Sequence, residues 1–300
     1  MKLRLFVICF GDKHADLYER VAIRSLTQPL NKAALPSDAV VSIYTDAATA
    51  ERVGKATQAL SPNLDVHIMD TSGDHYDVQN RCFIEEIGRC VREDATLLIV
   101  NPDCFWGDGS LPNLLAIAGE QDVCIASPHV RVDQNAFLRA VTEVDYWPVV
   151  PRYPDINNAA LVQIAMRTLH QSWIDADVTK ERANTFETGI AIRRISEGFY
   201  AVSHLQPTVF LARVNARDYG FFAERQGARG LWDHFWPAEL IGAGRYRVVA
   251  SSDAIFIAEL TEADTHNTAL HTVDPKKPDA FFRDAPHISA NRTVVGIWRS

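Results

Sequence analysis

The residues best suited to chemistry are Asn101, Pro102 and Asp103, which directly follow the apolar run Leu97–Val100. An aspartate at the end of a buried strand can ligate a divalent metal, and that metal can neutralise a diphosphate leaving group. Pro102 restricts the backbone between Asn101 and Asp103, which helps to aim both side chains. One interpretation is therefore a metal and phosphate site. The other is a polar turn in which Asp103 only terminates the strand.

The elements that must position these residues alternate between strands and helices. Short continuous apolar runs predict buried strands at 3–10, 39–44, 64–69, 96–100 and 122–126. Helical patterns lie between them at 14–27, 47–59, 79–92 and 110–119, with Ser110 expected as the N-cap of the last helix. This alternation predicts an α/β fold with right-handed crossovers and a mostly parallel sheet flanked by helices. Such sheets bind ligands outside the carboxyl ends of their strands, where Asp103 is expected.

The pattern changes near residue 127, where prolines begin to interrupt the chain. These are Pro128, Pro148, Pro151 and Pro154. The elements expected beyond them are a helix from Asn157 to Asp175, a strand over Thr188–Arg193, a helix over 231–243, and strands over Tyr246–Ala250 and Ala254–Ala258. The polar, proline-containing remainder is expected to wrap the surface. We therefore expect three segments, at 1–127, 128–261 and 262–300.

The composition restricts the classes of partner. A net charge of -8 argues against a nucleic-acid partner, which would require a basic face. No run of about 18 apolar residues occurs, so no transmembrane helix is expected. The cysteines show no zinc-binding spacing and are expected to be buried, reduced thiols, as is typical of cytoplasmic proteins. They are Cys9, Cys82, Cys90, Cys104 and Cys124.

A longer motif surrounds Asp103. Its positions are Asn80 in a predicted helix, the strand 96–100, Asn101-Pro102-Asp103, Gly109, Leu111, Leu114 and Leu115. On these residues the segment from about Asp77 to Leu115 resembles the GT-A-fold glycosyltransferases, in particular the bacterial rhamnosyltransferase-like branch of family 2 type. Many family members have Asp-x-Asp where this chain has Asn101 and Asp103. The resemblance implies a GT-A-like, Rossmann-type central sheet with a mixed C-terminal part on the acceptor side. In that fold, 1–127 would be the nucleotide-sugar-binding half, 128–261 the acceptor-binding half of the same GT-A domain, and 262–300 a wrapping tail.

The resemblance also implies a donor and a cofactor. The donor would be a nucleoside-diphosphate sugar, and a divalent metal, Mn²⁺ or Mg²⁺, would be held by Asp103. Asn80 and Asn101 are expected at the donor. The stretch Val40–Asp46 looks like the family's second strand, whose terminal aspartate contacts the nucleobase. Gly11 and Asp12, which follow the first strand, are expected near the base or ribose.

Two acidic residues are candidates for catalysis. The segment Trp232–Trp236 resembles the family helix that presents the catalytic carboxylate, and its acid here is Asp233. The segment Glu187–Arg194 resembles the strand beside the acceptor, which makes Glu187 the second candidate. In an inverting transfer, one such carboxylate accepts the proton of the acceptor hydroxyl. Asp233 can instead be a helix N-terminal acid that interacts with the helix dipole.

Three functions stay open. The first is a cytoplasmic glycosyltransferase acting on a glycan or small-molecule acceptor, with peripheral membrane association if that acceptor is lipid-linked. The second is a nucleotidyltransferase, which would need a glycine-rich loop after the first strand, whereas Gly11-Asp12-Lys13-His14 has one glycine. The third is a catalytically inactive GT-A-like scaffold, which the single acid at Asp233 and the amide at Asn101 leave open.

Overall fold

The chain forms two compact units, and neither is continuous in sequence. The computed structural model describes residues 2–118, 124–127, 129–143, 158–177, 182–183, 190–197, 199–204, 208–249, 251–263, 271–272 and 294–299. The first unit comprises Met1–Cys104, Leu111–Ala126 and Val209–Arg247. The second comprises Phe105–Ser110, Ser127–Thr208 and Val248–Ser300.

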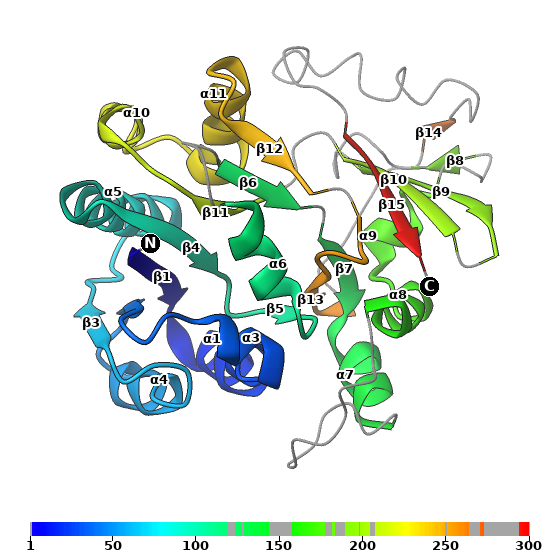
Figure 1. The fold of residues 1–300 in the computed structure, drawn as a ribbon, viewed down its shortest axis with the longest axis horizontal. Coiled ribbons are helices and arrows are strands. Elements are labelled where there is room, and N and C mark those ends of the chain that lie inside the picture. Colours follow the sequence, from blue (N-terminus) through cyan, green and yellow to red (C-terminus); the bar gives the residue numbers. More distant parts are fainter. Residues whose placement is uncertain are drawn as a thin grey trace. The chain divides into compact units, whose positions relative to one another are not determined.

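A seven-stranded sheet with the order β12-β6-β11-β4-β1-β2-β3 forms the centre of the first unit (Figure 1). Its strands are β1 (Lys2–Cys9), β2 (Val40–Thr45), β3 (Leu64–Ile68), β4 (Ala95–Val100), β6 (Cys124–Ser127), β11 (Thr208–Ala212) and β12 (Tyr246–Val248). β1 pairs in parallel with β2 and with β4, and β2 pairs in parallel with β3, whereas β11 runs antiparallel to β4. The predicted α/β class with a mostly parallel central sheet is confirmed.

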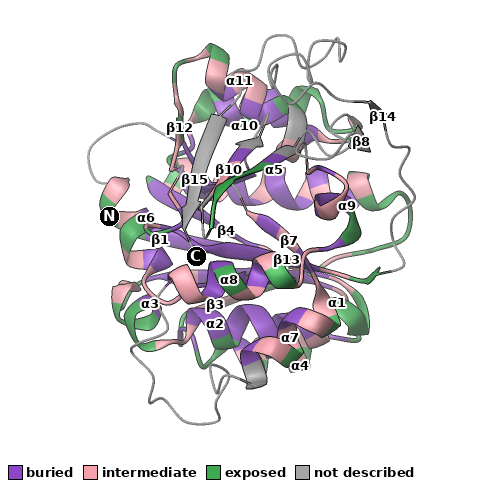
Figure 2. Cartoon of the chain, turned by 90° about the vertical axis from the view of Figure 1, so that its right-hand side faces the viewer, coloured by how far each residue is buried: buried purple, intermediate pink, exposed green. Residues whose placement is uncertain are grey.

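Helices flank this sheet on both faces, with α5 on one side and α2 and α4 on the other (Figure 2). The helices before β4 are α1 (Gly11–Leu17), the π-helical segment η1 (Tyr18–Ile23), α2 (Arg24–Leu26), α3 (Pro29–Ala34), α4 (Ala50–Thr57) and α5 (His75–Glu93). The later ones are α6 (Ser110–Ile117), α10 (Ala216–Glu224), the π-helical segment η2 (Leu231–Phe235) and α11 (Trp236–Gly242). Of these, α10 packs against α5.

A buried ionic group fixes α5 to the sheet. Arg4 on β1 is only 3% exposed. Its Nε donates to Oε1 of Glu86 at 2.7 Å, and a terminal nitrogen donates to Oγ of Ser42 at 2.6 Å. The hydroxyl of Tyr44 donates to the second oxygen of Glu86 at 3.1 Å. Burial alone would lower the pKa of Arg4, but the hydrogen bond and charge of Glu86 outweigh it, so the pKa is raised.

Within its described residues, the second unit contains three small sheets. The first has the order β5-β13-β7 and the second β15-β10-β9, while β14 pairs with β8. The strands are β5 (Cys104–Trp106), β7 (Val130–Asp133), β8 (Arg182–Ala183), β9 (Ile190–Ser196), β10 (Phe199–His204), β13 (Ile257–Thr261), β14 (His271–Thr272) and β15 (Val294–Arg299). The helices are α7 (Gln134–Glu143), α8 (Asn158–Arg167) and α9 (Gln171–Ile174). β15, from the segment expected to wrap the surface, pairs antiparallel with β10.

The single helix predicted from Asn157 to Asp175 is wrong, because the chain breaks between α8 and α9. The backbone at the break pairs with β7 instead of continuing the helix. The N–H of Asp133 donates to the carbonyl of Thr168 at 2.7 Å, and the N–H of His170 donates to the carbonyl of Arg131 at 3.0 Å. His170 then serves as the N-cap of α9.

Ser110 has a different role from the one predicted, because α6 begins at this residue and its hydroxyl does not cap the helix. The Ser110 hydroxyl donates to the carbonyl of Phe256 at 3.2 Å and accepts from the N–H of Phe256 at 3.0 Å. The N–H of Gly107 donates to the same carbonyl at 2.9 Å. A Cβ at Gly107 would overlap the side-chain oxygen of Asn158. The strand predicted to begin at Ala254 begins only at Ile257.

The five cysteines are buried free thiols, which confirms their predicted burial. Desolvation raises the pKa of Cys9 and of Cys82 to about 12, so neither thiol is an activated nucleophile. Within the described part of the chain, no helix is both long enough and apolar enough to cross a bilayer.

Candidate functional site

The strand order of the central sheet reverses beside β1. Along the chain, β2 and β3 are added on one side of β1, and β4 is added on the other. The carboxyl ends of β1 and β4 therefore flank a topological switch point, where open parallel sheets bind their ligands. The register of β1 with β2 and β4 brings Gly11, Asp46 and Asp103 to nearly the same level. Because strands lie about 4.8 Å apart, the ends of β2 and β4 are separated by about 10 Å.

Asp46 ties the end of β2 to the end of β1. The N–H of Gly11, a residue with φ +76°, donates to Oδ2 of Asp46 at 2.6 Å. Oδ1 accepts from the N–H groups of Ala48 and Thr49 at 2.9 and 3.0 Å. Partial burial raises the pKa of Asp46, but the hydrogen bonds from these three N–H groups lower it more, so the pKa lies below its ordinary value. Asp12, next to Gly11, is exposed.

Asn101, Pro102, Asp103 and Cys104 form a β-turn at the end of β4. The N–H of Cys104 donates to the carbonyl oxygen of Asn101 at 3.1 Å. Pro102 occupies the second turn position, where its fixed φ is favoured. Pro102 is buried, whereas Asn101 and Asp103 are partly exposed. The turn thus places an amide and a carboxylate two residues apart at the carboxyl edge of the sheet.

These two side chains fit one kind of metal site. Among the residues that the structure describes, no three His, Cys, Asp or Glu side chains are grouped so as to hold a metal ion. Mg²⁺ does not require such a cage, because one or two carboxylates, substrate phosphates and water commonly complete its coordination. Oxygen ligands of this kind also suit Mn²⁺. Asp103 and Asn101 therefore fit a cation that is shared with a diphosphate.

Asn80 was expected at the donor, and the structure places it inside the first unit, on α5. It is 1% exposed, and its Nδ2 donates to the carbonyls of Gln226 and Ala228 at 2.7 and 2.8 Å. Beside it, Arg229 forms an ion pair with Asp74 at 3.0 Å. These contacts hold the loop before η2 against the first turns of α5. Arg229, 74% exposed, is a cation near this edge that sequence reasoning missed.

Asp233 lies in the first turn of η2 and is partly buried. The neighbouring Trp232 stacks on Phe83 of α5, with ring centroids 5.5 Å apart and planes at 18°. Because α5 follows the parallel strand β3, its N-terminus lies at the carboxyl edge of the sheet. η2 therefore begins near the edge that carries Gly11, Asp46 and Asp103. Glu187, the other predicted catalytic acid, lies outside the described residues.

One strongly perturbed carboxylate belongs to the second unit. Glu259 on β13 accepts from Nε2 of His129 at 2.7 Å and pairs with Arg131 at 2.7 Å, both on or beside β7. Burial raises the pKa of Glu259, but His129 and Arg131 lower it to about 2. The group joins β7 to β13, and we interpret it as structural.

No protein-family model matches the sequence, and no curated protein matches it. Among solved structures, the chain is similar to mouse xyloside xylosyltransferase 1 in its apo form, at 12% identity over 48% of this chain and 59% of that one, with a TM-score of 0.31. It is similar to a Pyrobaculum calidifontis mannosyltransferase in complex with GDP-Man and Mn²⁺, at 14% identity over 88% of this chain and 59% of that one, with a TM-score of 0.41. A Bacillus anthracis protein described as a putative glucose-1-phosphate thymidylyltransferase, in complex with sucrose, matches at 8% identity. The match covers 89% of this chain and 98% of that one, with a TM-score of 0.36. The chain thus spans 59% of the length of each of these two glycosyltransferases.

Proposed function

We propose that this protein is a glycosyltransferase that moves a sugar from a nucleoside-diphosphate donor to a hydroxyl acceptor. The observation that carries the proposal is the arrangement at the switch point of the sheet. Gly11, Asp46 and Asp103 follow three neighbouring parallel strands and leave the sheet at nearly the same level. Ligands of open α/β sheets bind at this position.

The residues at this edge would have two roles: some would hold the cation, and others would position the donor. Asp103, with Asn101 beside it, would hold a divalent cation, which supplies positive charge to a leaving diphosphate. The rigid pair Gly11 and Asp46 would form the wall against which the base or ribose lies, with Asp12 next to it. Asn80 would act indirectly, because its amide fixes the loop before η2.

A transferase of this kind also needs a group that accepts the proton of the acceptor hydroxyl. We assign that role to Asp233, since η2 begins near the same edge and its carboxylate is partly buried. Glu187 stays the second candidate. No proton donor is needed for the leaving group when a cation neutralises the diphosphate.

The nucleotidyltransferase alternative is disfavoured by the connection between β1 and α1. β1 ends at Cys9 and α1 begins at Gly11, so Phe10 alone joins them. A glycine-rich loop that wraps a triphosphate has no room there. The scaffold alternative is not affected by this geometry, and only an assay separates it from a transferase.

We further propose a glycan or small-molecule acceptor, with peripheral membrane association where the acceptor is lipid-linked. The buried free thiols support a reducing compartment, and we propose the cytoplasm.

The decisive experiment measures which phosphate product is released. The protein is incubated with Mn²⁺ and a panel of UDP-, GDP- and dTDP-sugars, with and without simple glycosides as acceptors, and nucleoside diphosphate is quantified. A parallel reaction contains nucleoside triphosphates and sugar 1-phosphates, and pyrophosphate is quantified. We expect nucleoside diphosphate from the first and no pyrophosphate from the second. Pyrophosphate release would establish the nucleotidyltransferase instead, and donor binding without any release would establish the scaffold.

A further inference from the structure

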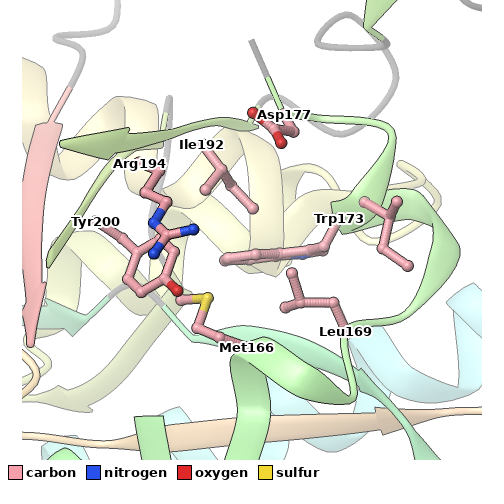
Figure 3. Close-up of a pocket in the computed structure, with 8 residues that line it drawn as sticks. Met166, Leu169, Trp173, Asp177, Ile192, Arg194 and Tyr200 are labelled. Atoms are coloured by element: carbon pink, nitrogen blue, oxygen red, sulfur yellow. The ribbon is translucent and has the colours of Figure 1, made fainter. Parts of the chain in front are cut away.

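The second unit contains a cavity to which the function proposed above assigns no role. Its volume is about 390 Å³, within the range of small-molecule sites. Among the residues that the structure describes, the lining side chains are Met166, Leu169, Trp173, Ile174, Asp177, Ile192, Arg194 and Tyr200. Figure 3 shows Trp173 and Leu169 on one side of the cavity, and Tyr200 and Arg194 on the other.

The fold forms this cavity from three elements. The break between α8 and α9 allows Met166 and Trp173, on separate helices, to face the same space. The chain after α9 closes one end, because the N–H of Ile192 donates to the carbonyl of Ala176 at 2.9 Å. The strands β9 and β10 form the opposite wall.

Arg194 and Tyr200 form a polar end on that wall. They are directly opposite one another across β9 and β10, so their side chains share a face of the sheet. Ile192, two residues before Arg194, lies on the same face. Within the described part of the chain, Nε of Arg194 donates to the carbonyl of Ser196 at 3.4 Å, and its two terminal nitrogens have no hydrogen-bond partner. Those terminal nitrogens are the ones that recognise a carboxylate.

Among the described residues, the rest of the lining is apolar or aromatic except for Asp177. Trp173 and Ile192 are 1% and 4% exposed, so they are fixed in place by the surrounding protein. The partly exposed ring of Tyr200 and the apolar side chains of Met166 and Leu169 are suited to a flat hydrocarbon body, which loses little entropy on binding. Asp177, an acidic residue of the lining, lies beside Ile192, with which it forms an isolated β-bridge.

We propose that this cavity binds a monoanionic small molecule with an aromatic body and one carboxylate. The carboxylate pairs with Arg194, and the aromatic body lies against Tyr200, Met166 and Leu169. The proposal concerns the second unit alone and does not depend on the proposed transferase activity.

The test uses a matched pair of soluble probes, 4-phenylbutyrate and its neutral amide, 4-phenylbutanamide. Isothermal titration calorimetry on the whole protein measures both affinities in the absence of nucleotide. We expect the carboxylate to bind about tenfold more tightly than the amide, as a hydrogen bond to a charged group requires. Arg194→Gln should abolish this preference and leave the two probes with equal affinity. Met166→Trp, which fills the cavity, should weaken both probes.

The control is Arg193→Gln. Arg193 is the preceding residue on β9, is also exposed, and faces the opposite side of the strand. It should keep the tenfold preference. The proposal is overturned if 4-phenylbutyrate does not bind saturably, if the amide binds equally well, or if Arg193→Gln and Arg194→Gln behave alike. It is also overturned if a neutral sugar such as methyl α-glucoside binds in an Arg194-dependent way and the carboxylate does not. Melting curves of each variant confirm that it is folded.

Discussion

The N–H of Gly11 and the carboxylate of Asp46 are joined by a 2.6 Å hydrogen bond that ties the ends of β1 and β2 together. The other carboxylate oxygen holds the backbone at Ala48 and Thr49. One side chain therefore sets the relative position of the two strand ends at the switch point. A ligand at this edge would meet a preformed surface, which lowers the entropic cost of binding.

Asp46→Asn should lower stability most at neutral pH. Because the pKa of Asp46 is depressed in the folded protein, its carboxylate stabilises the fold above the unfolded-state pKa of about 3.9. That contribution is lost as the pH falls through the lower pKa of the folded state. Urea unfolding should show a difference of about 1–2 kcal/mol between wild type and variant at pH 7, and a smaller one near pH 3. Asp38→Asn, at an exposed turn position, serves as the control and should show no such trend. If the difference in unfolding free energy between wild type and Asp46→Asn did not depend on pH, the stabilising role of the Asp46 carboxylate would be contradicted.

Asp103→Asn should weaken binding of UDP or GDP by at least about tenfold when Mn²⁺ is present, a loss of about 1.4 kcal/mol. The reason is that the substitution removes the charge that would hold the cation. With the metal chelated, wild-type affinity should fall to that of the variant. Titration calorimetry measures all four affinities. Asp94→Asn, at the C-cap of α5, changes charge equally and should bind like wild type. If Asp103→Asn binds like wild type under both conditions, Asp103 is only a turn residue.

Asp233→Asn should lower acceptor-dependent turnover by about 10²- to 10⁴-fold, since it removes the proposed general base while keeping shape and volume. Donor affinity should hardly change, because the carboxylate would face the acceptor. The loss should therefore appear in kcat rather than in the donor KM. Steady-state kinetics with a donor identified by the release assay measure both parameters.

Glu187→Gln, measured beside it, decides between the two acids. If Asp233→Asn keeps most of its turnover and Glu187→Gln loses it, the general base lies on the segment around Glu187. A parallel, modest loss of both parameters with a lower Tm would give Asp233 a structural role only.

Glu86→Gln should destabilise the first unit by about 3 kcal/mol, because it leaves the buried guanidinium of Arg4 with less compensating charge. The double variant Arg4→Met, Glu86→Leu should recover a large part of that loss, since it removes both charges together. Urea unfolding of the three variants measures this. The exposed pair Arg217 and Glu239 is the comparison, and Glu239→Gln should change stability by less than about 1 kcal/mol. Additive losses in the double variant would contradict the coupling of Arg4 to Glu86.

The central strands could be predicted from the sequence because their signal is local. β4 is buried at every position, and its apolar run Leu97–Val100 is continuous. In β1 the apolar run from Leu3 is interrupted by Arg4, which is buried and whose charge is compensated by Glu86, far along the chain. The carboxyl-end position of Asp103 followed from the end of that run. The placement of Gly11 and Asp46 beside it followed from the rule for parallel sheets.

The remaining features depend on contacts between distant segments, which periodicity does not record. Asn80 looks like any polar helix residue until Gln226 and Ala228 present their carbonyls to it. The helix break at Thr168 has no proline or glycine to mark it, and it exists because the backbone pairs with β7. The cavity next to Trp173 depends on that break, so no pattern in the sequence indicates it.

The antiparallel strand β11 has a consequence for synthesis of the protein. On the ribosome, β1, β2 and β4 emerge early, but the partner on the other side of β4 is encoded far downstream, at Thr208–Ala212. Until translation passes that point, the nascent chain exposes an apolar strand with an unpaired edge, which is a site for misassociation. Chaperone contact with the nascent chain should therefore be concentrated in this interval. The first unit, which contains β1, is therefore complete only after its last segment, Val209–Arg247, has been translated.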